Sequence, residues 1–230
     1  MLVLFPIAAF SQQHPVVIEL FTSQGCSSCP AADKNLAELI ETAEKTGQPV
    51  YGLSFHVDYW NYIGWKDPYS NPEYTERQRK YALVMNLESV YTPQMIVNGE
   101  VEFVGSNKEA SSDAIAHALA KKMEYQITLN SIQNKDGKIT VSYSLNNHPS
   151  NLTVNAAVAE QKVGNEVSRG ENSGRRLAHR NVVRSFTSVE AQQDGVIEIK
   201  SPDRFSSSSL IVFIQDKAWH IKGAAAIKIY

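Results

Sequence analysis

The chain contains two cysteines, Cys26 and Cys29, which are separated by two serines in the stretch LFTSQGCSSCP, residues 20–30. A Cys-x-x-Cys pair at the start of a helix suits thiol–disulfide exchange, because the unpaired N–H groups and the macrodipole of the helix stabilise a thiolate. We expect Cys26 to be the exposed nucleophile and Cys29 the buried thiol that resolves a mixed disulfide. Ser27 and Ser28 are small and polar, so they can hydrogen-bond the thiolate and contact a substrate.

A second group of candidate residues lies in SFHVDYWNYIGWKDP, residues 54–68. His56 and Asp58 share one face of a predicted strand by its period of two. The imidazole is a candidate for proton transfer or for stabilising the Cys26 thiolate, and the alternative is a His–Asp pair that only holds the loop. Trp60 belongs to an aromatic cluster that either lines a substrate groove or forms the small core of its own loop.

The elements that must position these residues follow from the hydrophobic pattern. Strands are predicted at 16–23, 49–60, 91–100 and 102–106, the last two joined by an Asn-Gly turn. Helices are predicted at 30–47, 71–89 and 106–123, two of them with a proline in the first turn. This order is a βαβ unit followed by a ββα unit, which predicts an α/β domain with a central mixed sheet over residues 14–124.

The second half of the chain has a different pattern. Seven short strand-like runs are separated by turn sequences, and they lie at 125–132, 138–145, 152–160, 177–189, 195–200, 209–216 and 221–230. This pattern predicts an antiparallel β-sandwich domain over residues 125–230.

The stretch GENSGRRLAHRNVVR, residues 170–184, carries four arginines and His179. Residues 14–124 hold 9 basic and 15 acidic side chains, whereas residues 125–230 hold 13 basic and 9 acidic ones. The basic stretch is therefore either a loop that folds over the acidic first half and contributes to its site, or a long hairpin with solvated arginines. The formal net charge of −2 gives no reason to expect a nucleic-acid partner.

Residues 2–10 form an apolar run that is followed by small residues near Ser11. The run is shorter than the ~20 residues that span a bilayer, so it predicts the remnant of an export signal over residues 1–13 rather than a membrane span. A buried first strand is the alternative. Export to the periplasm or out of the cell would place the cysteine pair where disulfides persist.

The stretches VVIELFTSQGCSSCP and TPQMIVNG resemble the thioredoxin superfamily. More narrowly, IELFTSQGCSSCP, FHVDYWN, GWKDPYS, YTPQMIVNG and GENSGRRLAHRNVVR resemble the secreted thioredoxin-like family catalogued as domain of unknown function 1223. The resemblance implies a thioredoxin-like fold for residues 14–124 and thiol chemistry. It also implies a cis bond between Thr92 and Pro93, whose loop would offer backbone groups to an extended substrate. Many thioredoxins have a buried acid six residues before the nucleophile; here that residue is Leu20, and Glu19 is a proton-transfer candidate or a salt-bridge partner.

Three functions are consistent with these residues. The first is an exported thiol–disulfide oxidoreductase that acts on a protein or peptide substrate, exchanges electrons with a second redox partner, and needs no cofactor beyond the Cys26–Cys29 disulfide and no metal. The second is a non-catalytic binding module with a structural or redox-sensing disulfide. The third is a protein that handles a soft metal ion such as copper through Cys26, Cys29 and His56.

Overall fold

The computed structural model describes residues 14–202 and 207–229. Its helices are α1 (Cys29–Thr46), η1 (Asn61–Ile63), α2 (Pro72–Val84) and α3 (Lys108–Leu119). Its strands are β1 (Val16–Thr22), β2 (Val50–His56), β3 (Gln94–Val97), β4 (Val101–Val104), β5 (Ile127–Lys135), β6 (Lys138–Leu145), β7 (Thr153–Glu166), β8 (Arg176–Glu190), β9 (Asp194–Lys200), β10 (Ser208–Gln215) and β11 (Ile221–Ile229).

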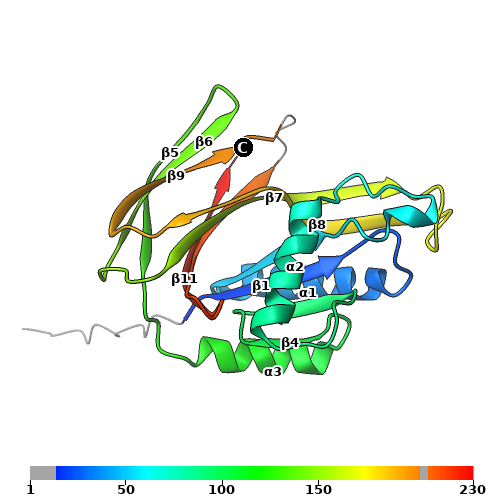
Figure 1. The fold of residues 1–230 in the computed structure, drawn as a ribbon, viewed down its shortest axis with the longest axis horizontal. Helices are drawn as coiled ribbons and strands as arrows, with labels where there is room; N and C mark the ends of the chain where they lie inside the picture. Colours follow the sequence, from blue (N-terminus) through cyan, green and yellow to red (C-terminus); the bar gives the residue numbers. More distant parts are fainter. Residues whose placement is uncertain (1–13, 203–206, 230) are drawn as a thin grey trace, which may run out of the picture.

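Eight of these strands form one curled mixed sheet in the order β11-β10-β7-β8-β2-β1-β3-β4. Strands β1 and β2 are parallel, and β8 joins β2 in parallel through the pair Ser54 and Val182. The other neighbours in this sheet are antiparallel. Strands β5, β6 and β9 form a second, three-stranded antiparallel sheet. In Figure 1 the small sheet lies at one end of the molecule and the helices lie at the other.

The expected fold class, a thioredoxin-like α/β domain followed by a separate β-sandwich, is wrong. The helices and strands occur in the expected order along the chain, but the large sheet takes strands from both halves. Strand β2 would otherwise be an exposed sheet edge with unpaired backbone groups. The long strand β8 covers that edge, and Nδ2 of Asn181 donates to the carbonyl oxygen of Gly52 at 3.0 Å.

Local sequence explains the helix and turn boundaries near the cysteines. Pro30 lies in the first turn of α1, where the missing N–H is not needed, and Gly47 ends the helix with a left-handed φ of 70°. The side chain of Asn71 caps α2 by accepting from the N–H of Glu73. Asn98 and Gly99, both with positive φ, make the tight turn between β3 and β4.

Three hydrophobic clusters hold the layers together. Helices α1 and α3 pack on the face of β1 and β3 that carries Ile18 and Leu20. Helix α2 packs on the opposite face, in a cluster that also includes Val183 of β8 and Phe213 of β10. The small sheet packs on β7 and β10. The second cluster joins the two halves of the chain in one core, so the halves are not packed independently.

No helix in the described part of the chain has the length and apolar character needed to cross a membrane. The export signal expected over residues 1–13 lies outside the described residues.

Candidate functional site

Cys26 lies in the turn that follows β1, and Cys29 is the first residue of α1. The two sulfurs form a disulfide, and the Cα atoms are 5.4 Å apart. The N–H of Cys26 donates to the carbonyl of Ser23 at 3.2 Å, and the N–H of Cys29 donates to the carbonyl of Cys26 at 3.3 Å. These turns place the disulfide at the N-terminal tip of α1, between a strand and a helix as the spacing predicted.

Both cysteines are buried. Cys26 is 1% exposed and Cys29 is 0% exposed, so the expectation that Cys26 is an exposed nucleophile is wrong for the oxidised protein. Ser27 and Ser28 between them are exposed. The disulfide therefore lies directly beneath the surface, and another segment of the chain must screen it.

The β7–β8 loop, residues 167–175, is hydrogen-bonded to the turn that carries the cysteines. Nδ2 of Asn172 donates to the carbonyl oxygens of Gln24 at 2.9 Å and of Cys26 at 2.8 Å. Oε2 of Glu171 accepts a hydrogen bond from the backbone N–H of Ser27 at 2.8 Å. The carboxylate thus occupies the helix tip, where a negative charge is favoured. The hydrogen bonds from Ser27 lower the pKa of Glu171.

The loop belongs to the basic stretch that the sequence singled out, and it does fold over the first half of the chain. The groups that bind there are Glu171 and Asn172 rather than the arginines. Arg175 acts indirectly, because its Nη1 donates to Oδ1 of Asn172 at 2.8 Å. Arg180 and Arg184 form ion pairs farther along β8.

The residues expected to contact a substrate gather beside Cys26. The bond between Thr92 and Pro93 is cis, and the carbonyl oxygen of Thr92 lies 3.8 Å from Sγ of Cys26. Nε1 of Trp60 donates to Oγ1 of Thr92 at 2.7 Å. Oγ of Ser28 lies 3.3 Å from the same sulfur. Ser28 and Thr92 therefore lie beside the sulfur of Cys26, Pro93 follows Thr92 through the expected cis bond, and Trp60 reaches the same place through its bond to Thr92.

A buried chain of acids and imidazoles lies behind the disulfide. Nδ1 of His56, at the end of β2, is 2.7 Å from Oδ2 of Asp67, and both side chains are fully buried. The rings of His56 and His179 are 4.7 Å apart. Nδ1 of His179 is 3.3 Å from Oδ2 of Asp33. Asp33 follows Cys29 by four residues on α1, so the two side chains share one face of the helix.

Gln24 links this chain to the β7–β8 loop. Its backbone N–H donates to Oδ2 of Asp67 at 2.8 Å, and its side-chain nitrogen lies 3.1 Å from Nε2 of His179. Its side-chain oxygen accepts from Nε1 of Trp65, and its carbonyl accepts from Asn172. Gln24 therefore connects the β7–β8 loop to both buried carboxylate–imidazole pairs through hydrogen bonds.

Several buried polar atoms in this region have no hydrogen-bond partner among the described residues. They are Thr22 Oγ1, Asp33 Oδ1, Ser54 Oγ, His56 Nε2 and His179 Nδ1. The pairing of β1 with β2 places Thr22 beside His56 on the α1 side of the sheet. An unsatisfied buried polar group costs about 1–3 kcal/mol, so such groups are rare where packing alone is at work. These atoms lie together on the α1 side of the sheet, where they can accept or donate further hydrogen bonds.

The surroundings of His179 and Asp67 favour the charged form of each side chain. Burial opposes the charge on His179, but Asp33, and Asp67 more weakly, outweigh it and raise the pKa of His179 above its usual value. Burial also opposes the charge on Asp67, but His56 and the N–H groups of Gln24 and Tyr69 hold its pKa below the usual range.

Two of the predicted proton-transfer residues lie elsewhere. Glu19 points to the opposite face of β1, where Nε and Nη2 of Arg77 bind its two carboxylate oxygens at 2.5 and 2.9 Å. Of the two roles expected for Glu19, the structure shows the salt-bridge partner. Asp58 accepts a hydrogen bond from Oγ1 of Thr75 and joins the end of β2 to α2. His56 has an aspartate partner as expected, but the partner is Asp67 rather than Asp58.

Sequence reasoning missed Asp33, Asp67, His179, Gln24 and Asn172 as members of the site. Only Asp33 had a usable signal, its position one helical turn after Cys29. The others reach the site through contacts between distant segments; Gln24 and Asn172, for example, are 148 positions apart.

The copper-binding alternative would need Cys26, Cys29 and His56 to converge. The described residues contain no group of three or more His, Cys, Asp or Glu side chains arranged to hold a metal ion.

Comparisons with known proteins identify a family and a fold. The model of the family described as "Protein of unknown function (DUF1223)" matches residues 17–215. The crystal structure of a protein from Agrobacterium tumefaciens is 24% identical, covers 92% of this chain and 93% of its own, and superposes with a TM-score of 0.69, which shows a shared fold alone. β-Glucosidase 3B from Thermotoga neapolitana is 9% identical over 47% of this chain and 16% of its own. Its TM-score of 0.22 is too low to indicate a shared fold. No curated protein matches the chain.

Proposed function

Because the chain belongs to the DUF1223 family, whose description assigns no activity, we propose a function from the site itself. The protein is an exported thiol–disulfide oxidoreductase that uses the Cys26–Cys29 disulfide on a protein or peptide substrate. The observation that carries the proposal is the group of buried, under-bonded acids and imidazoles one helical turn behind Cys29. A disulfide that served packing alone would have no use for that group.

The reaction requires a thiolate, a proton acceptor and a leaving thiolate. A substrate thiolate attacks Sγ of Cys26, the bond between Cys26 and Cys29 breaks, and Cys29 leaves as a thiolate. In the proposal, Asp33, paired with His179, takes up the proton that the first substrate thiol loses and passes it to Cys29. A second substrate thiol loses its proton and attacks the substrate sulfur of the mixed disulfide, which forms the substrate disulfide and releases Cys26 as a thiolate. Cys26 takes up this second proton, so two electrons and two protons have moved from the substrate to the protein. The reverse sequence oxidises a substrate dithiol.

Access to Cys26 requires the β7–β8 loop to leave the helix tip. The bond from Ser27 to Glu171 is exposed, so its loss costs little. Opening of the loop would bare Sγ of Cys26 beside the carbonyl of Thr92 and the ring of Trp60. These groups would then receive an extended substrate segment.

The test compares wild-type protein with Cys26→Ser and Cys29→Ser in the reduction of insulin by dithiothreitol. Wild type is expected to accelerate the reaction, and Cys26→Ser is expected to abolish the acceleration. Cys29→Ser should retain a stable mixed disulfide, because the resolving thiol is missing, and its isolation would name the substrate. Ser112→Ala, on the exposed face of α3, serves as the control and should behave as wild type. No acceleration by wild type and no trapped partner would contradict the proposal.

Burial of both sulfurs favours a second candidate, a binding module with an inert structural disulfide. Equilibration with glutathione buffers separates the two candidates. A reduction potential below about −300 mV together with absent exchange activity identifies the inert disulfide. A higher potential with reversible titration supports the oxidoreductase.

Export is the remaining part of the proposal, and the apolar run at residues 2–10 supports it. N-terminal sequencing of the protein recovered outside the cytoplasm should give a mature chain that begins near Ser11. Recovery only from the cytoplasm with residues 1–10 retained would contradict it.

A further inference from the structure

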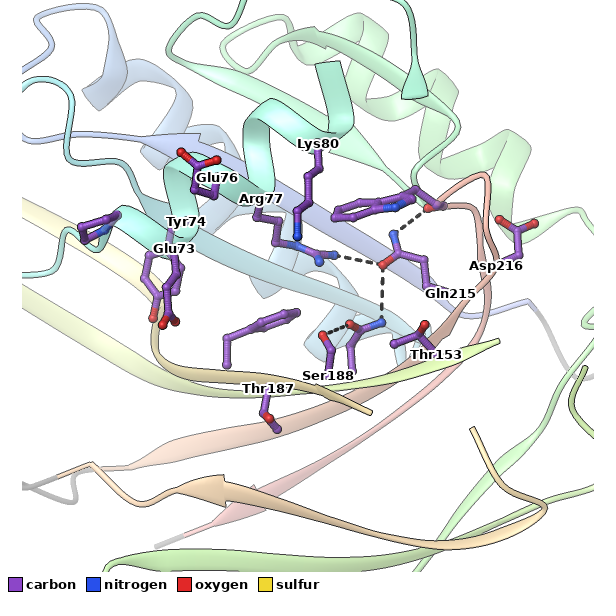
Figure 2. A pocket seen from close by; sticks show the side chains of 14 residues that line it. Glu73, Tyr74, Glu76, Arg77, Lys80, Thr153, Thr187, Ser188, Gln215 and Asp216 are labelled. Atoms are coloured by element: carbon purple, nitrogen blue, oxygen red, sulfur yellow. Dashed lines mark hydrogen bonds between the residues drawn. The ribbon is translucent and has the colours of Figure 1, made fainter. Parts of the chain in front are cut away.

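A cavity of about 530 Å³ lies on the opposite side of the large sheet from α1, between α2, the strands β7 and β8, and the turn from β10 to β11. Figure 2 shows the side chains that line it. None of them belongs to the disulfide site, so the cavity has no place in the proposed exchange reaction.

The floor of the cavity is a hydrogen-bonded network around Gln215. Its side-chain nitrogen donates to the carbonyl of Trp219 at 2.6 Å and to the hydroxyl of Tyr81 at 2.9 Å. Its side-chain oxygen lies 3.4 Å from both Nη2 of Arg77 and Nδ2 of Asn155. Oγ of Ser188 donates to Asn155 at 2.6 Å. Most polar groups at the floor of the cavity are therefore hydrogen-bonded to other residues of the protein.

Arg77 keeps one set of donors free. It is 6% exposed, and its Nε and Nη2 bind Glu19. Nη1 donates to no described residue, and it is not among the fully buried unsatisfied atoms, so it is reachable from the cavity that Arg77 lines. Its N–H groups can bind only an acceptor.

Lys80 supplies the unpaired positive charge. Figure 2 shows its side chain directed from α2 towards Arg77 and Gln215. Lys80 forms no ion pair with the described residues, whereas Glu19 neutralises Arg77. Three acids lie at the rim: Glu76 pairs with Arg79, Asp216 pairs with Lys222, and Glu73 forms no ion pair with the described residues. These acids would repel a ligand with more than one negative charge.

Aromatic rings form the walls. The rings of Phe186 and Trp219 lie 4.6 and 5.0 Å from Cζ of Arg77. Trp219 has a φ of 69°, a conformation that bulky residues rarely adopt. Two hydrogen bonds hold it there: its N–H donates to the carbonyl of Asp216, and its carbonyl accepts from Nε2 of Gln215. The cavity thus combines fixed apolar walls with donors that remain free at its base.

We propose that this cavity binds a small monocarboxylate with an apolar body. The carboxylate accepts from Nζ of Lys80 and Nη1 of Arg77, and the body lies against Phe186 and Trp219. Lys80 is directed towards Arg77, so the two cationic side chains suit one carboxylate, whereas the acids at the rim disfavour further negative charge. A preformed cavity with a few convergent polar groups is the usual form of a small-molecule site.

The experiment titrates the whole protein with phenylacetate and with hexanoate, and follows binding by ligand-observed NMR. Phenylacetamide, which has the same body without the charge, is the matched ligand control. We expect saturable binding with a dissociation constant below about 1 mM, and binding of the amide at least about tenfold weaker. Failure of both carboxylates to saturate below about 10 mM, or equal binding of acid and amide, would overturn the proposal.

Lys80→Ala should weaken phenylacetate binding about tenfold without changing stability, because Lys80 is exposed and has no ion pair with the described residues. Lys45→Ala, an exposed lysine on α1, should bind as wild type. Equal affinity in Lys80→Ala and wild type would contradict the proposed carboxylate position. Cys26→Ser should also bind as wild type, so the outcome is separate from that of the exchange reaction.

Discussion

Two buried charge networks lie on opposite faces of β1 and β2, and they are built in different ways. Under α2, both oxygens of Glu19 are bound by Arg77, and Tyr81 adds a further hydrogen bond. Under α1, the His56–Asp67 and His179–Asp33 pairs lie among several polar atoms that have no partner in the described part of the chain. In the first network both carboxylate oxygens are bound, whereas in the second a carboxylate oxygen and two imidazole nitrogens have no hydrogen-bond partner among the described residues.

The difference separates a network that holds the fold from one that can move protons. Both oxygens of Glu19 are bound by Arg77 on the face of β1 opposite α1, so Glu19 is not positioned to exchange protons with a thiol. Asp33 keeps one oxygen without a bond, and it stands one turn from Cys29. Unused hydrogen-bonding capacity next to a reactive group is costly for stability, and it is therefore informative about function.

The largest expected effect tests the network of Glu19 and Arg77. Arg77→Leu should lower the free energy of unfolding by about 3–5 kcal/mol, because it leaves Glu19 buried and without its counterion. Urea denaturation measures the loss. Arg79→Leu removes an exposed arginine from the same helix and should cost less than about 0.5 kcal/mol. A loss below about 1 kcal/mol for Arg77→Leu would show that this network does not hold the fold.

The second prediction tests the unsatisfied network. Asp33→Asn should slow thiol–disulfide exchange by about 10²-fold or more, and should shift the pH profile of the reaction, because a proton-transfer group is lost. Its free energy of unfolding should change little compared with Arg77→Leu. Asp113→Asn, exposed on α3, is the control. An unchanged rate and pH profile in Asp33→Asn would remove Asp33 from the mechanism.

The third prediction concerns the β7–β8 loop. Asn172→Ala removes two hydrogen bonds to the turn of the cysteines, each contributing about 0.5–1.5 kcal/mol. The loop should open more often, so reduction of the disulfide by dithiothreitol should accelerate about tenfold. Ser173→Ala, in the same loop, removes a bond that stays within the loop and should leave the rate unchanged. Equal rates in all three proteins would mean that the loop does not control access.

The smallest effect is a pH dependence of stability. Asp33 raises the pKa of the buried His179 against the opposing effect of burial. The stabilisation is therefore complete below the pKa of an unfolded histidine, about 6.5, and is lost as the pH rises through the higher folded value. The difference in unfolding free energy between wild type and His179→Gln should shrink between pH 6 and pH 9. A difference that grows with pH would contradict the assignment, and His117→Gln, exposed on α3, should show no such trend.

Local patterns were sufficient for the elements and for part of the site. The seven strands of the second half, the three long helices and the cis bond before Pro93 occur as predicted. These features depend on hydrophobic period, caps, turns and motif spacing, which act over a few residues or along a recognisable motif.

The predicted division into an α/β domain and a separate β-sandwich was wrong, because β8 of the second half pairs with the edge strand β2 of the first half. Nothing in the period of residues 176–190 distinguishes a strand inside a separate sandwich from one that pairs in parallel with β2. Asp67 and His179 were not recognised as partners of His56 for the same reason: the local pattern does not show which distant segments meet.

By itself, the sequence of this protein determined where its helices and strands lie and that its two cysteines meet at a helix tip. Only the tertiary structure decided that β8 completes the large sheet, that the β7–β8 loop is hydrogen-bonded to the turn of the cysteines, and that Asp33, His179, His56 and Asp67 form one buried chain. The reason is physical: helix and strand formation depends on neighbouring residues, whereas burial and polar contacts depend on segments that the sequence separates by as many as 155 positions.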